Sequence, residues 1–262
     1  MLTLLGAGQG QNGVAFDTDY QAVLNRATTL GYTLPSASQR IKQNSLVLSL
    51  KSGGIWNKLD VLYIFANDGG SDFATLNWKA PTLNQATLIN SPTFTNNQGF
   101  TGNGTSSYIN TNFNPATSGV NYTLNNASRN IFVRNQSTSA STLDGVPSGN
   151  SNASVGVNTT LLRINQGATS LPTSADYSGS NFLKSIHRTS VSNIELFVGT
   201  TQTSRTFNSV AVISESQLIL ARGVNATGSY GGSQISMYSM GANLVTENTA
   251  YVNAFNTYIT SL

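Results

Sequence analysis

The C-terminal segment constrains the fold of this chain most, because a strand pattern passes there directly into a helix pattern. Residues 234–240 alternate, so that Ile235, Met237 and Ser239 would lie on one face of a strand and the intervening residues on the other. Thr246 is placed to cap a helix that follows. The apolar stripe of this helix consists of Tyr251, Ala254, Phe255, Tyr258, Ile259 and Leu262. Such a stripe must be buried, so we expect the C-terminus to be part of the fold.

The composition favours one folded domain with many short strands and an uncharged surface. Charged residues make up only 9% of the 262 residues, whereas roughly a quarter is usual. Hydrophobic residues reach 39%, which is too many for a disordered chain. The 13 Lys and Arg side chains are scattered along the sequence, so we expect no nucleic-acid partner. No stretch has the length and apolarity that membrane insertion requires.

The N-terminal region divides into an arm and a pair of helices. Residues 1–16 are uncharged and rich in Gly and Gln, which predicts a flexible arm that contacts a partner. Its apolar run is too short for an export signal. Asp17 or Thr18 can cap a first helix, and Ser36 with Gln39 has the spacing of a capping box for a second. Such a small helical cap, residues 17–58, must dock on the main domain or on another subunit.

From residue 59 the helical period is lost, and short apolar runs alternate with turn clusters. The run 59–65 is almost unbroken in its apolar character, as expected for a strand buried on both faces. Further strands are predicted at 74–78, 108–111, 128–133, 154–157, 161–165, 184–188, 194–197, 209–212, 217–221 and 234–240. Residues 59–262 are therefore expected to form a single β-sandwich that includes the C-terminal helix.

Two segments carry a resemblance to known families. The segment FTGNGTSSYI at 100–109 resembles the opening of concanavalin A-like sandwiches, in which a glycine-rich turn leads into a core strand. The C-terminal strand and helix resemble the end of laminin-G-like jelly-roll domains. Together they imply an all-β, concanavalin A-like jelly roll over 59–262. The whole chain, with GGIWNKLD at 53–60 and FATLNW at 73–78, also looks like structural proteins of bacteriophages that infect Bacteroidota, which implies a virion component.

The sequence offers no obvious catalytic group. Glycan hydrolysis requires two carboxylates that flank one bond, yet none of the predicted strands carries two of the ten acidic residues. Glu195 stands alone on its strand. His187 is the single histidine, and no serine lies in a nucleophile elbow. We therefore expect His187 to be a hydrogen-bonded or solvent-facing residue and the protein not to be an enzyme. A catalytic pair assembled from separate loops is the alternative.

Four side chains are candidates for binding. The turn at 67–72 places Asp68 and Asp72 where their oxygens would bind calcium. The alternative is a turn in which they bond only their own backbone, with no cofactor. Tyr177 and Tyr230 lie in loops rich in Gly and Ser and are the candidate platforms for sugar rings. Both tryptophans, Trp56 and Trp78, are interpreted as packing residues.

These observations lead to one functional hypothesis and two rivals. We expect a phage virion structural protein, in a capsid vertex, spike or tail fibre, whose jelly roll binds host-surface glycans. Its partners would be other virion proteins and further copies of the chain in a homo-oligomer. The first rival is a carbohydrate-binding module of a secreted bacterial protein. The second is a glycan-cleaving enzyme, which two carboxylates in one groove would favour.

Overall fold

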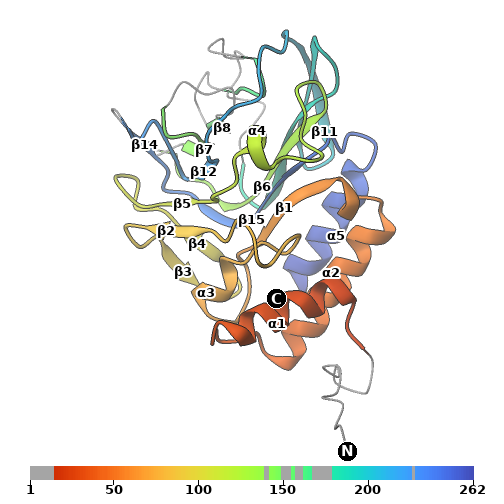
Figure 1. The fold of residues 1–262 in the computed structure, drawn as a ribbon, viewed down its shortest axis with the longest axis vertical. Helices are drawn as coiled ribbons and strands as arrows, with labels where there is room; N and C mark the ends of the chain where they lie inside the picture. Colours follow the sequence, from red (N-terminus) through yellow and green to blue (C-terminus); the bar gives the residue numbers. More distant parts are fainter. Residues whose placement is uncertain (1–14, 139–141, 149–154, 157–161, 167–178, 226–227) are drawn as a thin grey trace, which may run out of the picture.

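The computed structural model describes residues 15–138, 142–148, 155–156, 162–166, 179–225 and 228–262. In these residues the chain forms three layers, which are a group of helices, a large antiparallel sheet and a smaller sheet (Figure 1). The expected all-β jelly-roll sandwich with helices near both ends is confirmed.

The large sheet has the strand order β11-β10-β9-β6-β15-β4-β3, with β1 also paired to β15. Its strands are β1 (Leu59–Ile64), β3 (Thr93–Thr95), β4 (Gly99–Thr101), β6 (Ala127–Asn135), β9 (Phe182–Arg188), β10 (Asn193–Val198), β11 (Thr201–Thr206) and β15 (Gln234–Gly241). β15 is central, because β6 pairs with one edge of it while β4 and β1 share the other edge. The predicted C-terminal strand is thus the one that joins the two halves of the sheet.

The smaller sheet covers one face of the large sheet and completes the sandwich. Its order is β2-β5-β12-β7-β8, and a two-stranded sheet of β13 and β14 accompanies it. The bounds are β2 (Thr87–Ile89), β5 (Tyr108–Asn110), β7 (Thr142–Gly145), β8 (Val155–Gly156), β12 (Leu218–Ile219), β13 (Ala221–Arg222) and β14 (Ser229–Tyr230). Ile109, Leu143 and Ile219 from this sheet meet Ile131 and Ile186 of the large sheet in one buried cluster.

Three helices cover the other face of the large sheet, as Figure 1 shows, and confirm that the helical cap docks on the sandwich. They are α1 (Thr18–Thr29), α2 (Ala37–Ser52) and α5 (Asn248–Ser261). The predicted caps form, since Asp17 accepts from the Asp19 N–H at 3.0 Å and Ser36 accepts from the Gln39 N–H at 3.2 Å. Phe16, at the end of the predicted arm, packs edge-on against Tyr20.

Three short helical turns complete the described elements. These are η1 (Trp56–Lys58), α3 (Ser71–Ala74) and α4 (Pro115–Ser118). In the part of the chain that the structure describes, no helix combines the length and apolarity needed to span a membrane.

Two predicted strands are wrong, and a third is described only in part. The apolar run 74–78 contains the end of α3 and a turn, because the Thr75 hydroxyl bonds the carbonyl of Asp72 at 2.7 Å and turns the chain. The segment 209–212 forms no extended strand. Of the predicted strand 161–165, residue 161 lies outside the described residues, and the remainder carries a single bridge at Leu162. A short apolar run bounded by turns is ambiguous between strand and buried loop, and here tertiary packing decided it.

Two details of the C-terminal segment also differ from the prediction. The ladder between β15 and β6 shifts its register between Ile235 and Met237, so the strict alternation is broken by a bulge. Ile235 consequently joins the sandwich core, while Met237 faces the helices. The last helix begins after Glu247 and not after Thr246. The side chain of Glu247 makes no capping bond to the helix and instead forms an ion pair with Lys58 at 2.7 Å.

His187 on β9 faces the helices and is hydrogen-bonded, which is the first of the two environments predicted for it. Its Nδ1 accepts from the Leu244 N–H at 3.1 Å, and the ring of Phe197 lies edge-on at 5.4 Å. The side chain is fully buried. Burial lowers the pKa of His187 to about 3, and the charge of Glu195 opposes this only in part. The fold therefore holds the imidazole neutral.

We expect this histidine to make the protein acid-sensitive. The unfolded chain binds a proton at His187 below about pH 6.5, whereas the folded chain does so only near pH 3. The contribution of the neutral His187 to the free energy of unfolding is therefore fully present above pH 6.5 and is lost as the pH falls toward 3. At pH 4 the loss amounts to about 3 kcal/mol. Urea denaturation at pH 7 and pH 4 measures this loss. His187→Gln should lose about 3 kcal/mol less than the wild type over the same interval, and equal losses would contradict the assignment.

Candidate functional site

The candidate binding surface is a pair of tyrosines at the outer side of the smaller sheet. Tyr230 on β14 was predicted as a ligand-binding residue, and its ring centroid lies 6.2 Å from that of Tyr108 on β5, with an interplanar angle of 40°. Both side chains are half-buried. Tyr177, the other predicted tyrosine, lies outside the described residues. We call Tyr108 and Tyr230 the tyrosine pair.

Strand alternation explains why Tyr108 faces outward. Ile109 is fully buried in the sandwich core, so its neighbours Tyr108 and Asn110 project from the opposite side of β5. Tyr108 pairs across the strands with Ile89 of β2. Burial and the adjacent Tyr230 raise the pKa of Tyr108. Its hydroxyl therefore remains protonated at neutral pH and can donate a hydrogen bond.

The loop that precedes Tyr108 is ordered by one asparagine. The Oδ1 atom of Asn103 accepts from the N–H groups of Thr105, Ser106 and Ser107 at 2.8–2.9 Å. The Asn103 N–H in turn donates to the Ser107 hydroxyl at 2.8 Å. The short loop between β4 and β5 is thus rigid, which lowers the entropic cost of binding a ligand beside it.

This loop also touches the segment that carries Tyr230. The Gly104 N–H donates to the Gly231 carbonyl at 3.3 Å. A Cβ atom at Gly102 would lie 2.1 Å from that same carbonyl oxygen. Only glycine permits so close an approach of the two backbones. The relative positions of Tyr108 and Tyr230 are therefore set by direct backbone contact between their loops.

Both tryptophans are packing residues, as predicted. Trp56 and Trp78 belong to the helix-facing cluster, and Trp78 is fully buried. The Lys79 Nζ lies 4.3 Å from the centroid of the Trp56 ring and donates to the Trp56 carbonyl. The face of Trp56 is thus occupied by a cation from the same chain. Neither indole is available as a platform for a sugar ring.

Asp68 and Asp72 follow the same turn but have different surroundings. The Asp68 carboxylate accepts from the Ser36 N–H at 3.0 Å, at the start of α2. Asp72 is exposed in the first turn of α3. The part of the chain that the structure describes contains no group of three or more His, Cys, Asp or Glu side chains that could hold a metal ion. Calcium binding by this turn stays a prediction.

Most carboxylates of the described chain are engaged in structural contacts. Asp17 and Asp19 share Lys51 at 2.7 and 2.6 Å, and Asp60 accepts from the backbone of residues 120–122. Burial alone would raise the pKa of Glu195, but hydrogen bonds from Ser204, Gln202 and Asn193 lower it. For the Asp72 carboxylate, the described residues provide no hydrogen-bond or ion-pair partner. No acid and nucleophile pair of the kind that glycan hydrolysis needs is recognisable in this part of the chain.

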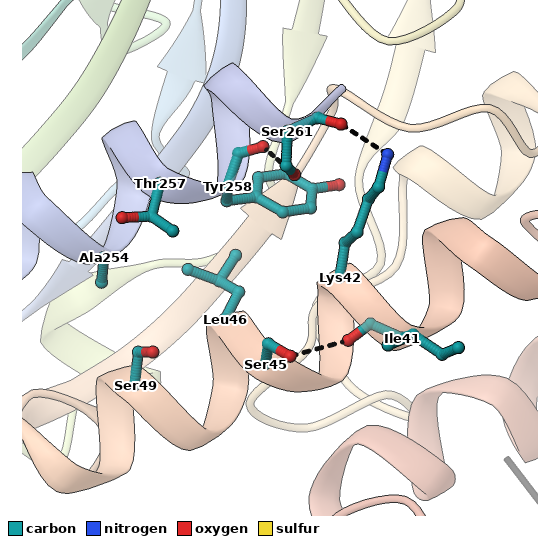
Figure 2. Close-up of a pocket in the computed structure, with 9 residues that line it drawn as sticks. All are labelled: Ile41, Lys42, Ser45, Leu46, Ser49, Ala254, Thr257, Tyr258 and Ser261. Carbon is teal, nitrogen blue, oxygen red and sulfur yellow. Dashed lines mark hydrogen bonds between the residues drawn. The ribbon is translucent and has the colours of Figure 1, made fainter. Parts of the chain in front are cut away.

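A depression lies between α2 and α5 (Figure 2) and has a volume of about 220 Å³. It is mostly apolar, and the polar side chains of Lys42, Ser45, Tyr258 and Ser261 are already bonded. Among the described residues, only the hydroxyls of Ser49 and Thr257 in this lining have no hydrogen-bond partner. The Ser45 hydroxyl donates to the Ile41 carbonyl, the Ser261 hydroxyl to the Tyr258 carbonyl, and Lys42 to the Ser261 carbonyl. This groove therefore offers few free hydrogen-bonding groups to a sugar.

Sequence reasoning singled out Tyr230 as a candidate but not its neighbour Tyr108. The signal was present, because Tyr108 precedes the buried Ile109 in the glycine-rich motif and must face outward on a strand. The contact between them had no signal in the sequence. Residues 108 and 230 come together only through the sheet order, in which β5 pairs with β12 and β13 contacts both β12 and β7.

Comparison with known proteins gives a likeness of fold. No protein family and no characterised protein matches the sequence. Among solved structures, the receptor binding domain of botulinum neurotoxin C/D mosaic serotype superposes with a TM-score of 0.50 at 11% identity, over 77% of this chain and 52% of that chain. A single-residue mutant of HCR/D gives a TM-score of 0.50 at 11% identity, over 77% and 53%. The chain thus spans about half the length of these structures.

Proposed function

We propose that the protein is a glycan-binding domain that does not cleave its ligand. The observation that carries the proposal is the half-buried tyrosine pair at the outer side of the smaller sheet. Aromatic rings bury the apolar C–H face of a sugar, while hydroxyl groups at their rim form hydrogen bonds. The fold is compatible with this role, since the receptor binding domain of a botulinum neurotoxin shares it.

The rigid surroundings of the pair support this proposal. Asn103 holds the adjacent loop through three backbone hydrogen bonds, and Gly102 and Gly231 fix the spacing of the two tyrosine-bearing segments. A preformed surface loses little conformational entropy when a ligand binds. Most carboxylates of the described chain are engaged in structural contacts. A glycosidase needs two acidic side chains that are free to flank one bond, so this arrangement favours a binding function over hydrolysis.

The biological setting that we propose is a phage virion. The low content of charged residues, 9%, and the resemblance to phage structural proteins support a surface component of a particle. Its partners would then be other virion proteins and further copies of the chain. The rival setting is a carbohydrate-binding module of a secreted bacterial protein. Neighbouring capsid, portal or tail genes favour the virion, and a catalytic domain in the same gene favours the module.

Glycan binding is tested on an array of neutral and acidic bacterial capsule and lipopolysaccharide glycans. We expect the wild type to bind at least one glycan without releasing reducing ends. Tyr230→Ala and Tyr108→Ala should each weaken that binding about tenfold, which corresponds to about 1.4 kcal/mol. Tyr230→Phe keeps the ring and should bind nearly as well as the wild type.

The control removes an aromatic ring elsewhere. Phe182 is 45% exposed on β9 of the large sheet, and Phe182→Ala should leave binding unchanged. The proposal is wrong if no glycan binds the wild type. It is also wrong if Phe182→Ala weakens binding as much as the substitutions in the tyrosine pair do.

A further inference from the structure

A polar pocket lies at the edge of the smaller sheet, on the strand next to the one that carries Tyr108. Its volume is about 420 Å³, which falls within the range of small-molecule sites. The lining residues are Asp72, Thr75, Gln85, Ala86, Thr87 and Leu88. β2 is the edge strand, and its Thr87 and Ile89 pair with Asn110 and Tyr108 of β5. Thr87 and Ile89 are two residues apart on one face, so the pocket begins roughly 7 Å from the partner of Tyr108.

The polar groups of the pocket are held in place by neighbours behind them. The Gln85 Nε2 donates to the Tyr32 hydroxyl at 2.7 Å and to the Thr75 hydroxyl at 3.0 Å. Both amide hydrogens are therefore used, and the Gln85 Oε1 is left as an acceptor. The Thr87 hydroxyl accepts from the Asn112 Nδ2 at 2.9 Å, so its own hydrogen can be donated.

The pocket also presents one carboxylate and an apolar base. The exposed Asp72 carboxylate has no partner among the described residues, so its oxygens are available to accept hydrogen bonds. Ala86 and Leu88 provide the apolar part of the lining. The pocket thus offers mainly acceptors above a hydrocarbon surface. A complementary ligand has several hydroxyl donors, an apolar face and no negative charge.

We propose that this pocket binds one neutral sugar residue of the glycan that stacks on the tyrosine pair. The Asp72 carboxylate and the Gln85 Oε1 accept from neighbouring hydroxyls, Thr87 donates to a ring substituent, and the apolar part of the lining contacts the C–H face. The carboxylate disfavours uronic and sialic acids, because two negative charges that are brought close together repel each other. This inference rests on the proposed function and adds to it a selection for neutral glycans.

The test compares a neutral and an acidic oligosaccharide by titration calorimetry with the full chain. We expect the wild type to bind the neutral one at least tenfold more tightly. Asp72→Asn should weaken neutral binding about fivefold and raise the relative affinity for the acidic one. Thr87→Val should weaken neutral binding by a similar factor. The matched control is Thr93→Val. Thr93 lies on the edge strand β3 and is exposed, like Thr87, so this substitution should have no effect.

Failure of this inference is distinguishable from failure of the proposed function. Wild-type affinity in both Asp72→Asn and Thr87→Val, together with loss of binding in Tyr230→Ala, would overturn the pocket and leave the tyrosine pair intact. Tighter binding of the acidic oligosaccharide by the wild type would also overturn it. The absence of any glycan binding by the wild type would instead overturn the proposed function. An unchanged melting temperature in each variant establishes that the fold is intact.

Discussion

Truncation of the chain before Thr246 is expected to give unfolded or insoluble protein, because the missing helix is part of the core. α5 buries Tyr251, Val252, Phe255 and Tyr258 against the large sheet. Each such side chain contributes roughly 1.5–3 kcal/mol when buried. The sum is comparable with the entire stability of a typical domain, about 5–15 kcal/mol. Circular dichroism and sedimentation of the truncated chain measure the result.

The buried end of this helix adds specific bonds that the truncation also removes. The Tyr258 hydroxyl donates to the Ala66 carbonyl at 2.6 Å and accepts from the Gln39 Nε2 at 2.8 Å. α5 therefore links α2 to the strand end after β1. Thr257→Ala on the exposed side of α5 is the control and should melt like the wild type. A truncated chain that stays soluble and melts cooperatively near the full-length temperature would contradict this account.

Replacement of Asp144 by Asn is expected to lower the free energy of unfolding by about 3–5 kcal/mol, because it leaves a buried charge without its partner. Arg129 on β6 and Asp144 on β7 join the two sheets, and each is only 1% exposed. The Arg129 Nη1 lies 2.7 Å from both carboxylate oxygens, and the Tyr238 hydroxyl donates to Asp144 at 2.8 Å. Urea denaturation of Asp144→Asn at pH 7 measures the loss.

A double substitution distinguishes the loss of the Arg129–Asp144 ion pair from general damage to the core. Arg129→Met with Asp144→Leu replaces both charges with apolar groups of similar size, and such exchanges are often neutral or stabilising. We expect the double variant to recover most of the stability that Asp144→Asn loses. A loss of less than 1 kcal/mol in Asp144→Asn, or a double variant less stable than the single one, would contradict the assigned role.

The parts of the fold that the sequence predicted are those governed by local chemistry. The caps at Asp17 and Ser36 form because each side chain bonds an N–H two or three residues ahead. The buried strand β1 followed from an almost unbroken apolar run. β11 was missed, because its residues Thr-Gln-Thr-Ser-Arg-Thr show no apolar alternation. Only its pairing with β10 makes it a strand, and that pairing depends on tertiary structure.

The candidate site was predictable only in part for the same reason. Tyr230 has a local signal, since it lies among glycines and serines, and the outward direction of Tyr108 follows from the buried Ile109. The polar pocket has no such signal. Asp72 and Thr87 are separated by the turn and loop between α3 and β2, and Gln85 acquires its orientation from the distant Tyr32. These side chains line one pocket only because the folded chain brings their segments together.

The central claim is that glycans bind at the outer side of the smaller sheet. It is tested most directly by backbone-amide NMR during titration with a neutral oligosaccharide that the wild type binds. We predict that the shifted resonances cluster at Tyr108, Tyr230 and Thr87, while those of the groove between α2 and α5 in Figure 2 remain unchanged. Shifts concentrated around Leu46 and Thr257 in that groove, with the tyrosine pair unaffected, would contradict the account.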